Sequence, residues 1–326
     1  MTEAYPAWNL VNDTRQLSDD PLANPTLYNW NVVWVKTCDG GSWTGNRAEP
    51  DVIDGTPLYY RGRKILDATI DDLIPRGILN ATVSRQGSVS FQGVGVQSVE
   101  IAGTPHLRTH VLLYRVQDVV IGGGSAGALG VYLNVDHYRS RLDPERQMTF
   151  SALPDGGWFM DLNNKGYHDG MAWIASPRGM NAVLHPACEE AHRNSTRELC
   201  MFAPHVAPFI ETPIFALQAK FDAWQIPNIM GSEDVGLINA FGANMTALLK
   251  SNLLNRPRNG AFVDGCRHHC GGWDMYIVDG MTEAEAFDRW YSSGSAALPR
   301  EGRMIDESRY PCATCTCSFE QEHTGF

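Results

Sequence analysis

The stretch DVVIGGGSAGALGVYLNVD, residues 118–136, constrains the fold of this chain more than any other. The apolar residues at 119–121 are typical of a buried parallel strand, whereas the small and apolar residues at 126–133 are typical of a packed helix. A strand that turns sharply into a helix at Gly-x-Ser-x-Gly holds its serine on a strained backbone with the hydroxyl exposed. The stretch therefore predicts an α/β protein in which Ser125 is either a nucleophile or part of a glycine-rich packing turn. A phosphate-binding loop is disfavoured, because no lysine follows the glycines and no acidic residue is placed on a following strand.

Two later loops carry further residues of hydrolase type. The strand-like segment 213–218 is followed by Asp222, and the segment that begins at 261 is followed by His268 and His269. The order serine, aspartate, histidine, each after an apolar strand-like run, is that of the α/β-hydrolases. We therefore predict a mostly parallel sheet flanked by helices. Two alternatives stay open at this point, a loop-capping role for Asp222 and a solvent-exposed position for His268.

Three other segments have recognisable local patterns. Segment 29–38 reads as a strand, and apolar residues at helical spacing predict a helix from Gly62 that ends at Pro75 and Gly77. Thr282 and Glu285 have the spacing of a capping box, so a helix is expected to begin there.

The size and charge of the chain exclude some classes of function. A chain of 326 residues is long enough for one large α/β domain, so we expect residues 1–326 to form a single domain. The formal net charge of −11 argues against a nucleic acid partner, which requires a basic surface. No apolar run approaches the length that crosses a bilayer.

Eight cysteines allow two interpretations. Cys312 and Cys315 have the spacing of zinc ligands, which His268 or His269 would complete, but no second well-spaced pair accompanies them. Disulfides in an oxidising compartment are favoured, and four Asn-x-Ser/Thr sequences are compatible with a secreted glycoprotein. The opening MTEAYPAWNL lacks the pattern of a signal peptide, so we expect either a cytosolic protein or a secreted one whose true N-terminus is absent.

Together these residues resemble one family, the plant pectin acetylesterases with the animal carboxylesterase Notum. The family pattern implies Ser125 as nucleophile, Asp222 as triad acid and His269 as base, because the family's histidine lies directly before the second cysteine of Cys-x-x-His-Cys. It further implies an oxyanion donor at the N–H of Ala126 and neither a cofactor nor a metal. The resemblance runs from about Tyr28 to Cys317, through YNWNVVWVKTCDGGSWTG, LYYRGRKI, GGGSAGALGVYLNVD, TPIFALQAKFDAWQIPNI, CRHHC and YPCATC.

The same resemblance also implies which cysteines are oxidised. The family's extracellular habitat and the close spacing of these residues imply that Cys188 pairs with Cys200. They also imply that Cys266 and Cys270 are both oxidised and fix the loop that carries His269.

The chain departs from the family pattern in two places. The family's Gly-Gly-Gly-Trp motif, which supplies further oxyanion donors, is absent; residues 39–43, Asp-Gly-Gly-Ser-Trp, align with a later segment and receive no such role. We therefore expect that the N-terminal strands and a signal peptide are missing. Residues 83–117 have no counterpart in the family, and we expect a retained intron or an insertion loop there that contributes little to the core. Val83-Ser84 is compatible with a splice-donor sequence and Gln117 with a splice acceptor.

The resemblance implies a secreted serine esterase that removes O-acetyl groups from a cell-wall polysaccharide such as pectin. One alternative is a Notum-like carboxylesterase that removes a lipid from a protein. Another is a truncated, inactive member of the family or a non-catalytic binding protein.

Overall fold

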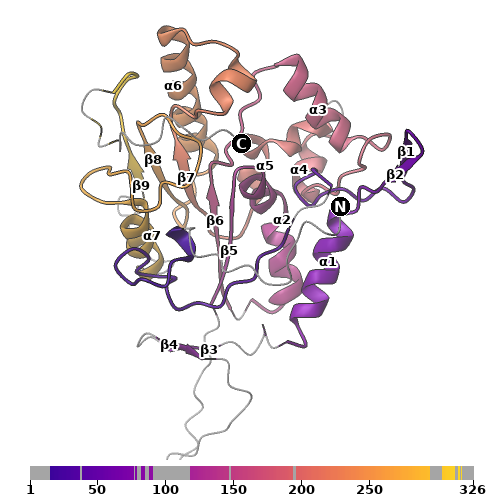
Figure 1. Cartoon of the computed structure of the whole chain (residues 1–326), viewed down its shortest axis with the longest axis horizontal. Coiled ribbons are helices and arrows are strands. Elements are labelled where there is room, and N and C mark those ends of the chain that lie inside the picture. Colours follow the sequence, from indigo (N-terminus) through magenta and orange to yellow (C-terminus); the bar gives the residue numbers. More distant parts are fainter. Residues whose placement is uncertain are drawn as a thin grey trace, which may run out of the picture.

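A five-stranded parallel sheet forms the centre of the protein, which we describe from a computed structural model (Figure 1). The strands lie in the order in which they occur in the sequence. This arrangement confirms the predicted α/β fold. The strands are β5 (Asp118–Gly124), β6 (Thr149–Asp155), β7 (Phe215–Ala219), β8 (Gly260–Asp264) and β9 (Arg303–Ile305). The structure describes residues 15–36, 39–76, 78, 82–84, 88–90, 118–146, 148–193, 196–293, 303–312, 315 and 317.

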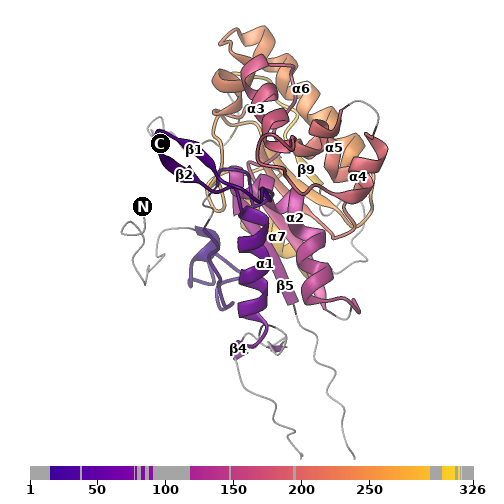
Figure 2. The same cartoon turned by 90° about the vertical axis from the view of Figure 1, so that its right-hand side faces the viewer.

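Helices connect the strands and cover the sheet. Figure 2 shows α1 and α2 side by side in front of β5. Among the described residues, no helix combines the length and the apolar character needed to cross a bilayer. The α-helices are α1 (Gly62–Leu73), α2 (Ala126–Leu142), α3 (Lys165–Ala175), α4 (Pro186–Ala191), α5 (Ala203–Val206), α6 (Val235–Asn252) and α7 (Glu283–Ser292). Shorter helical turns are η1 (Arg15–Leu17), η3 (Arg197–Met201), η4 (Ala207–Phe209) and the π-turn η5 (Ile226–Met230).

The two faces of the sheet are buried in separate apolar clusters. Successive side chains of a strand point to opposite faces, so Ala216 of β7 joins the larger cluster with α1, α2 and α6. Phe215 and Leu217 join the smaller cluster, where they meet Phe287 and Trp290 of α7. Every residue of β7 and β8 is buried, which fixes the ends of these strands, where the loops with Asp222 and His269 begin.

Two predicted helix signals are confirmed. α1 begins at Gly62 and ends at Leu73, with Leu66 and Ile70 buried against the core. Thr282 caps α7, because its side chain accepts a hydrogen bond from the N–H of Glu285, whose carboxylate accepts the N–H of Thr282.

The predicted strand at 29–38 is wrong where the structure describes it. Residues 31–36 belong to no strand, and Val32, Val33 and Trp34 are each more than half exposed. A strand needs a hydrogen-bonded neighbour, and residues 29–36 pair with no strand in the described part of the chain. Two hairpins not foreseen from the sequence are β1 (Asp51–Ile53) with β2 (Thr56–Leu58) and β3 (Thr82–Ser84) with β4 (Ser88–Ser90). Most of 83–117 lies outside the described residues, so its small contribution to the core stays a prediction.

Candidate active site

Ser125 occupies a strained turn between β5 and α2. Its backbone has φ 55° and ψ −122°, a conformation that is costly for a residue with a Cβ atom. Gly123 permits the turn, because a Cβ atom there would lie 2.7 Å from the backbone of Gly127. The backbone N–H of Ser125 donates to the carbonyl of Asp155 over 2.9 Å. This is the strand-turn-helix geometry that the sequence predicts at residues 118–136.

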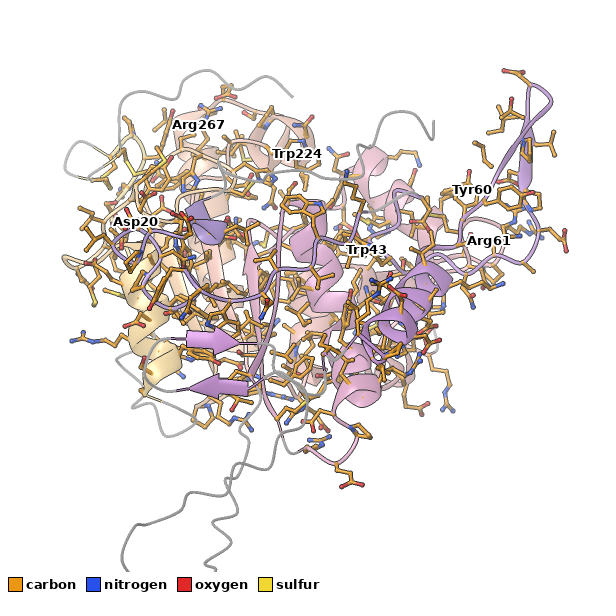
Figure 3. The ribbon with its side chains drawn as sticks, turned by 60° about the horizontal axis from the view of Figure 1, so that its bottom comes forward. Asp20, Trp43, Tyr60, Arg61, Trp224 and Arg267 are labelled. Atoms are coloured by element: carbon orange, nitrogen blue, oxygen red, sulfur yellow. A yellow bond between two sulfur atoms is a disulfide. The ribbon has the colours of Figure 1, made fainter. Side chains whose placement is uncertain are left out.

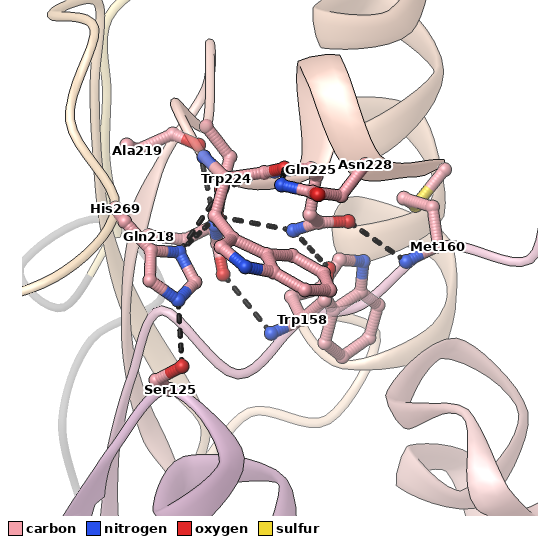
Figure 4. Close-up of polar contacts among 10 residues, drawn as sticks. Ser125, Trp158, Met160, Gln218, Ala219, Trp224, Gln225, Asn228 and His269 are labelled. Atoms are coloured by element: carbon pink, nitrogen blue, oxygen red, sulfur yellow. Dashed lines mark hydrogen bonds and ion pairs between the residues drawn. The ribbon is translucent and has the colours of Figure 1, made fainter. Parts of the chain in front are cut away.

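The structure brings three predicted site residues into one hydrogen-bonded chain, and Figure 4 shows its contact between Ser125 and His269. His269 Nε2 lies 2.7 Å from Ser125 Oγ, and His269 Nδ1 lies 3.0 Å from both carboxylate oxygens of Asp222. Asp222 is fully buried, and the His269 side chain is 10% exposed. A hydroxyl, an imidazole and a carboxylate in this order can generate an oxygen nucleophile.

His268 lies apart from this chain of contacts. Its Nε2 atom lies 2.8 Å from Asp264 Oδ2, and its ring stacks on Tyr276 with the centroids 4.0 Å apart. Its side chain is only 10% exposed, so the solvent-exposed position considered for His268 is wrong.

Asp222 accepts hydrogen bonds from four further donors. The backbone N–H groups of Trp224 and Gln225 bond to Oδ1, and the amide groups of Gln218 and Gln225 bond to Oδ2. A buried, ionised carboxylate requires hydrogen-bond donors, and these four groups supply them. Asp222 does cap its loop, but the same carboxylate also holds His269.

Gln218 and Gln225 connect Asp222 to the chain after β6. Gln218 Oε1 accepts the N–H of Trp158, and Gln225 Oε1 accepts the N–H of Met160, both at 3.0 Å (Figure 4). Sequence reasoning missed both glutamines, because nothing in QAK or AWQI indicates which side chain they face. Their one local signal is polarity within runs that are otherwise apolar.

Asp155 is a further buried carboxylate beside the site that the sequence did not indicate. Its Oδ2 atom accepts the N–H of Gly271 at 2.9 Å and an amide hydrogen of Gln16 at 3.0 Å. Burial raises the pKa of Asp155 to about 6, although the Gly271 bond and the charges of His268 and His269 favour its ionised form.

A small cavity of about 200 Å³ opens at Ser125 Oγ. The rings of Trp224 and Phe159 lie beside His269, with centroids 6.0 and 5.9 Å from the imidazole and 5.5 Å from each other. Ala126, the predicted oxyanion donor, also lines the cavity. The other lining residues are Gly40, Ser42, Leu129, Tyr167, Met171, Ile174 and Met201.

The loop 39–43, which received no site role from the sequence, forms one wall of this cavity. Ser42 Oγ donates to the carbonyl of Ala126 over 3.0 Å. The indole of Trp43 covers α2 so closely that a Cβ atom on Gly130 would lie 2.6 Å from it (Figure 3). Asp39 fixes the base of the loop by accepting the N–H groups of Gly41 and Gly62.

Three disulfides lie in the described residues, and they confirm the expected Cys188–Cys200 pair and the expected oxidation of Cys266. Cys188 pairs with Cys200 as expected. Cys266 pairs with Cys317, 51 residues away, and Cys312 pairs with Cys315. Cys270 is a free thiol, so the expectation that it is oxidised is wrong: residues close in sequence need not have facing Cβ atoms. The disulfide also removes Cys312 and Cys315 as zinc ligands.

The sequence matches the family described as Pectinacetylesterase over residues 8–85 and 107–318. The match omits residues 86–106, which lie inside the predicted insertion at 83–117, but it includes residues 83–85 and 107–117.

Curated relatives include enzymes with two kinds of substrate. Pectin acetylesterase 7 of Arabidopsis thaliana is 28% identical over 274 residues, which cover 76% of this chain and 59% of that protein. The palmitoleoyl-protein carboxylesterase NOTUM of Homo sapiens is 25% identical over 339 residues, covering 95% of this chain and 60% of that protein. This chain therefore spans about three fifths of the length of these relatives.

The fold resembles a solved structure of the Wnt deacylase Notum from Drosophila. The TM-score is 0.72 at 22% sequence identity, and the superposition covers 97% of this chain and 81% of the other.

Proposed function

This chain belongs to the pectinacetylesterase family, and we propose that it is a serine esterase that removes O-acetyl groups from a cell-wall polysaccharide. The observation that carries this proposal is the chain of contacts from Ser125 through His269 to Asp222 at the cavity.

The proposed reaction begins with Ser125. His269 Nε2 takes the hydroxyl proton while Oγ attacks the acetyl carbonyl, and Asp222 holds the Nδ1–H and stabilises the imidazolium. The negative oxygen of the tetrahedral intermediate accepts a hydrogen bond from the N–H of Ala126. His269 then returns the proton to the sugar oxygen as the ester bond breaks, leaving an acetyl group on Ser125. Water, activated by His269, releases acetate and restores the serine.

The size of the cavity favours a short acyl group. Its volume of about 200 Å³ is below the range of about 300–1,000 Å³ that holds drug-sized ligands. The apolar lining from Leu129, Met171 and Ile174 supports a second candidate, removal of a fatty acyl group from a protein, in which these side chains would contact the chain.

We propose that the protein acts outside the cell. The three disulfides among the described residues support this, because such bonds persist in oxidising compartments and are rare in the cytosol.

Hydrolysis of a series of esters of increasing acyl length by this chain tests the proposal. We expect release of acetate from acetylated pectin and faster turnover of acetyl than octanoyl esters, with nearly all activity lost in Ser125→Ala. Ser140→Ala, an exposed serine on α2, is the matched control and should keep full activity. Preference for octanoyl esters would favour the lipid-removing candidate. Absence of any turnover would favour the inactive or binding protein.

A further inference from the structure

A second group of ionisable side chains lies behind His269, away from the cavity. Asp264 ends β8, His268 lies four residues later in the loop, and Glu283 begins α7. One possible ligand atom from each, a ring nitrogen or a carboxylate oxygen, lies within 4.8 Å of those of the other two. Two segments, the end of β8 with the loop that follows it and the start of α7, therefore converge on one buried point.

Glu283 has no hydrogen-bond partner at this point. Its side chain is 0% exposed, and both of its carboxylate oxygens lack a donor. The Nδ1 atom of His268 is likewise buried without a partner, whereas Nε2 lies against Asp264. Burying an ionised carboxylate without a hydrogen-bond donor costs free energy, so a bound cation or a proton is required to stabilise it.

The surroundings make this carboxylate more costly still. Burial and the charges of Asp155, Asp264 and Asp274 raise the pKa of Glu283 well above its ordinary value. Negative groups thus surround a further negative group in the protein interior. A divalent cation would offset this charge by direct contact, as metal ions do where acidic groups are buried together.

The neighbouring residues hold the group in place. Tyr276 stacks on the ring of His268 and fixes its plane. Gly272 makes room for the carboxylate, because a Cβ atom there would lie 2.7 Å from Glu283 Oε1. Asp264 is itself fixed, since its Oδ1 atom accepts the N–H of Cys266 at 2.8 Å.

We propose that Asp264, His268 and Glu283 bind a divalent transition-metal ion, for which Zn²⁺ is the suitable probe. One imidazole and two carboxylates match the nitrogen and oxygen ligands of zinc, and water can complete the tetrahedron. This departs from the expectation of no metal drawn from the sequence. Two other groups of this kind in the described residues, around His192 and around Asp306, contain cysteines that are consumed by disulfides.

The ion would act as a structural link. It would join the end of β8, the loop that carries His269 and the start of α7, and so restrict the movement of the catalytic base. Its binding energy would contribute directly to folding, because the three ligands are assembled only in the folded chain.

The test measures metal content and thermal stability of the full chain, produced without a polyhistidine tag. Elemental analysis should find one Zn²⁺ ion per chain. Chelation should lower the unfolding midpoint, and ZnCl₂ should restore it. Glu283→Gln, which keeps the side-chain shape, should reduce bound zinc by at least about tenfold and abolish the response to ZnCl₂. His192→Gln, beside the Cys188–Cys200 disulfide, is the matched control and should retain the ion.

A second measurement uses the unaltered protein, so it does not depend on the folding of a variant. Replacement of Zn²⁺ by Co²⁺ should give visible ligand-field absorption that is lost when ZnCl₂ is added back. Absence of bound metal together with an unfolding midpoint insensitive to ZnCl₂ would overturn the proposal. A Glu283→Gln protein that keeps its zinc would do so too. If that variant is instead more stable than the parent at every metal concentration, Glu283 holds a proton and the proposal is wrong.

Discussion

Asp155 is bonded to Ser125 through its backbone: the carbonyl of Asp155 accepts the Ser125 N–H over 2.9 Å. Its carboxylate accepts the N–H of Gly271, two residues beyond His269. One residue at the end of β6 therefore contacts both the strained turn and the histidine loop, and we regard Asp155 as a positioning residue for the site.

Asp155→Asn should change how stability depends on pH. The pKa of Asp155 is raised from 3.8 to about 6, so the folded protein retains a proton that the unfolded chain releases. The parent therefore loses stability as pH rises from about 4 to about 6, by up to about 3 kcal/mol, and the asparagine variant does not. Urea unfolding measures the free energy of unfolding of both proteins. As pH rises across this range, the value for the variant minus that for the parent should increase by this amount. A difference that stays constant with pH would contradict the assignment.

Ser125→Ala and His269→Ala should not have additive effects. Each should lower kcat by about 10⁴-fold or more, because each breaks the same proton-transfer chain. The double variant should be no slower than either single one, as measured with an acetyl ester under saturating substrate. If the two losses multiply, the side chains do not act as a unit.

Asp222→Asn should preserve the fold and lose most activity. The amide can still accept from the loop N–H groups, but it no longer favours the imidazole tautomer with hydrogen on Nδ1, so kcat should fall by about 10⁴-fold. Circular dichroism should remain close to the parent, whereas the unfolding midpoint should fall, because the new NH2 group cannot accept from Gln218 and Gln225 as Oδ2 does. Retention of more than a tenth of the parent kcat would exclude Asp222 as the triad acid.

The two long-range disulfides should differ in their contribution to stability. Removing Cys266–Cys317, which closes a 51-residue separation, should cost about 4 kcal/mol, against about 3 kcal/mol for Cys188–Cys200 with its separation of 12. Alanine double variants compared by urea unfolding measure both costs. A smaller loss of stability for the Cys266–Cys317 pair than for the Cys188–Cys200 pair would contradict the assumption that these disulfides act by restricting the unfolded chain.

Met201→Ala should widen the range of acyl groups accepted. Met201 is 1% exposed and lines the cavity, so its truncation leaves space that a longer acyl chain can fill. The ratio of kcat/KM for butyryl over acetyl esters should rise by about tenfold. An unchanged ratio would show that the acyl group binds elsewhere.

The parts of the fold that could be predicted from sequence are those with local causes. The turn at Ser125, the start of α1 and the cap of α7 each depend on residues within a few positions of one another. The order after two apolar strands indicated Asp222 and a histidine at 268 or 269, and the family resemblance selected His269. The structure shows that both residues lie in one hydrogen-bonded chain with Ser125. Their catalytic roles stay a prediction.

The parts that could not be predicted depend on which segments become neighbours. Asp155 and Gln218 are polar residues near strand ends, and only the strand order brings Asp155 to Gly271 and Gln218 to the N–H of Trp158. The partner of Cys266 lies 51 residues away, so spacing pointed to the wrong cysteine. Segment 29–36 has the composition of a strand, but composition does not supply the neighbour that a strand requires.

The sequential strand order has a consequence for synthesis on the ribosome. Each new strand can dock on the edge left by the strand before it, so the sheet can grow in the direction of translation. Ser125 is made early, but His269 follows later, and Cys317, which ties down the histidine loop, is translated after all five strands. The nascent chain therefore lacks His269 until four of the five strands have been made, and the disulfide of its loop until all five have been made.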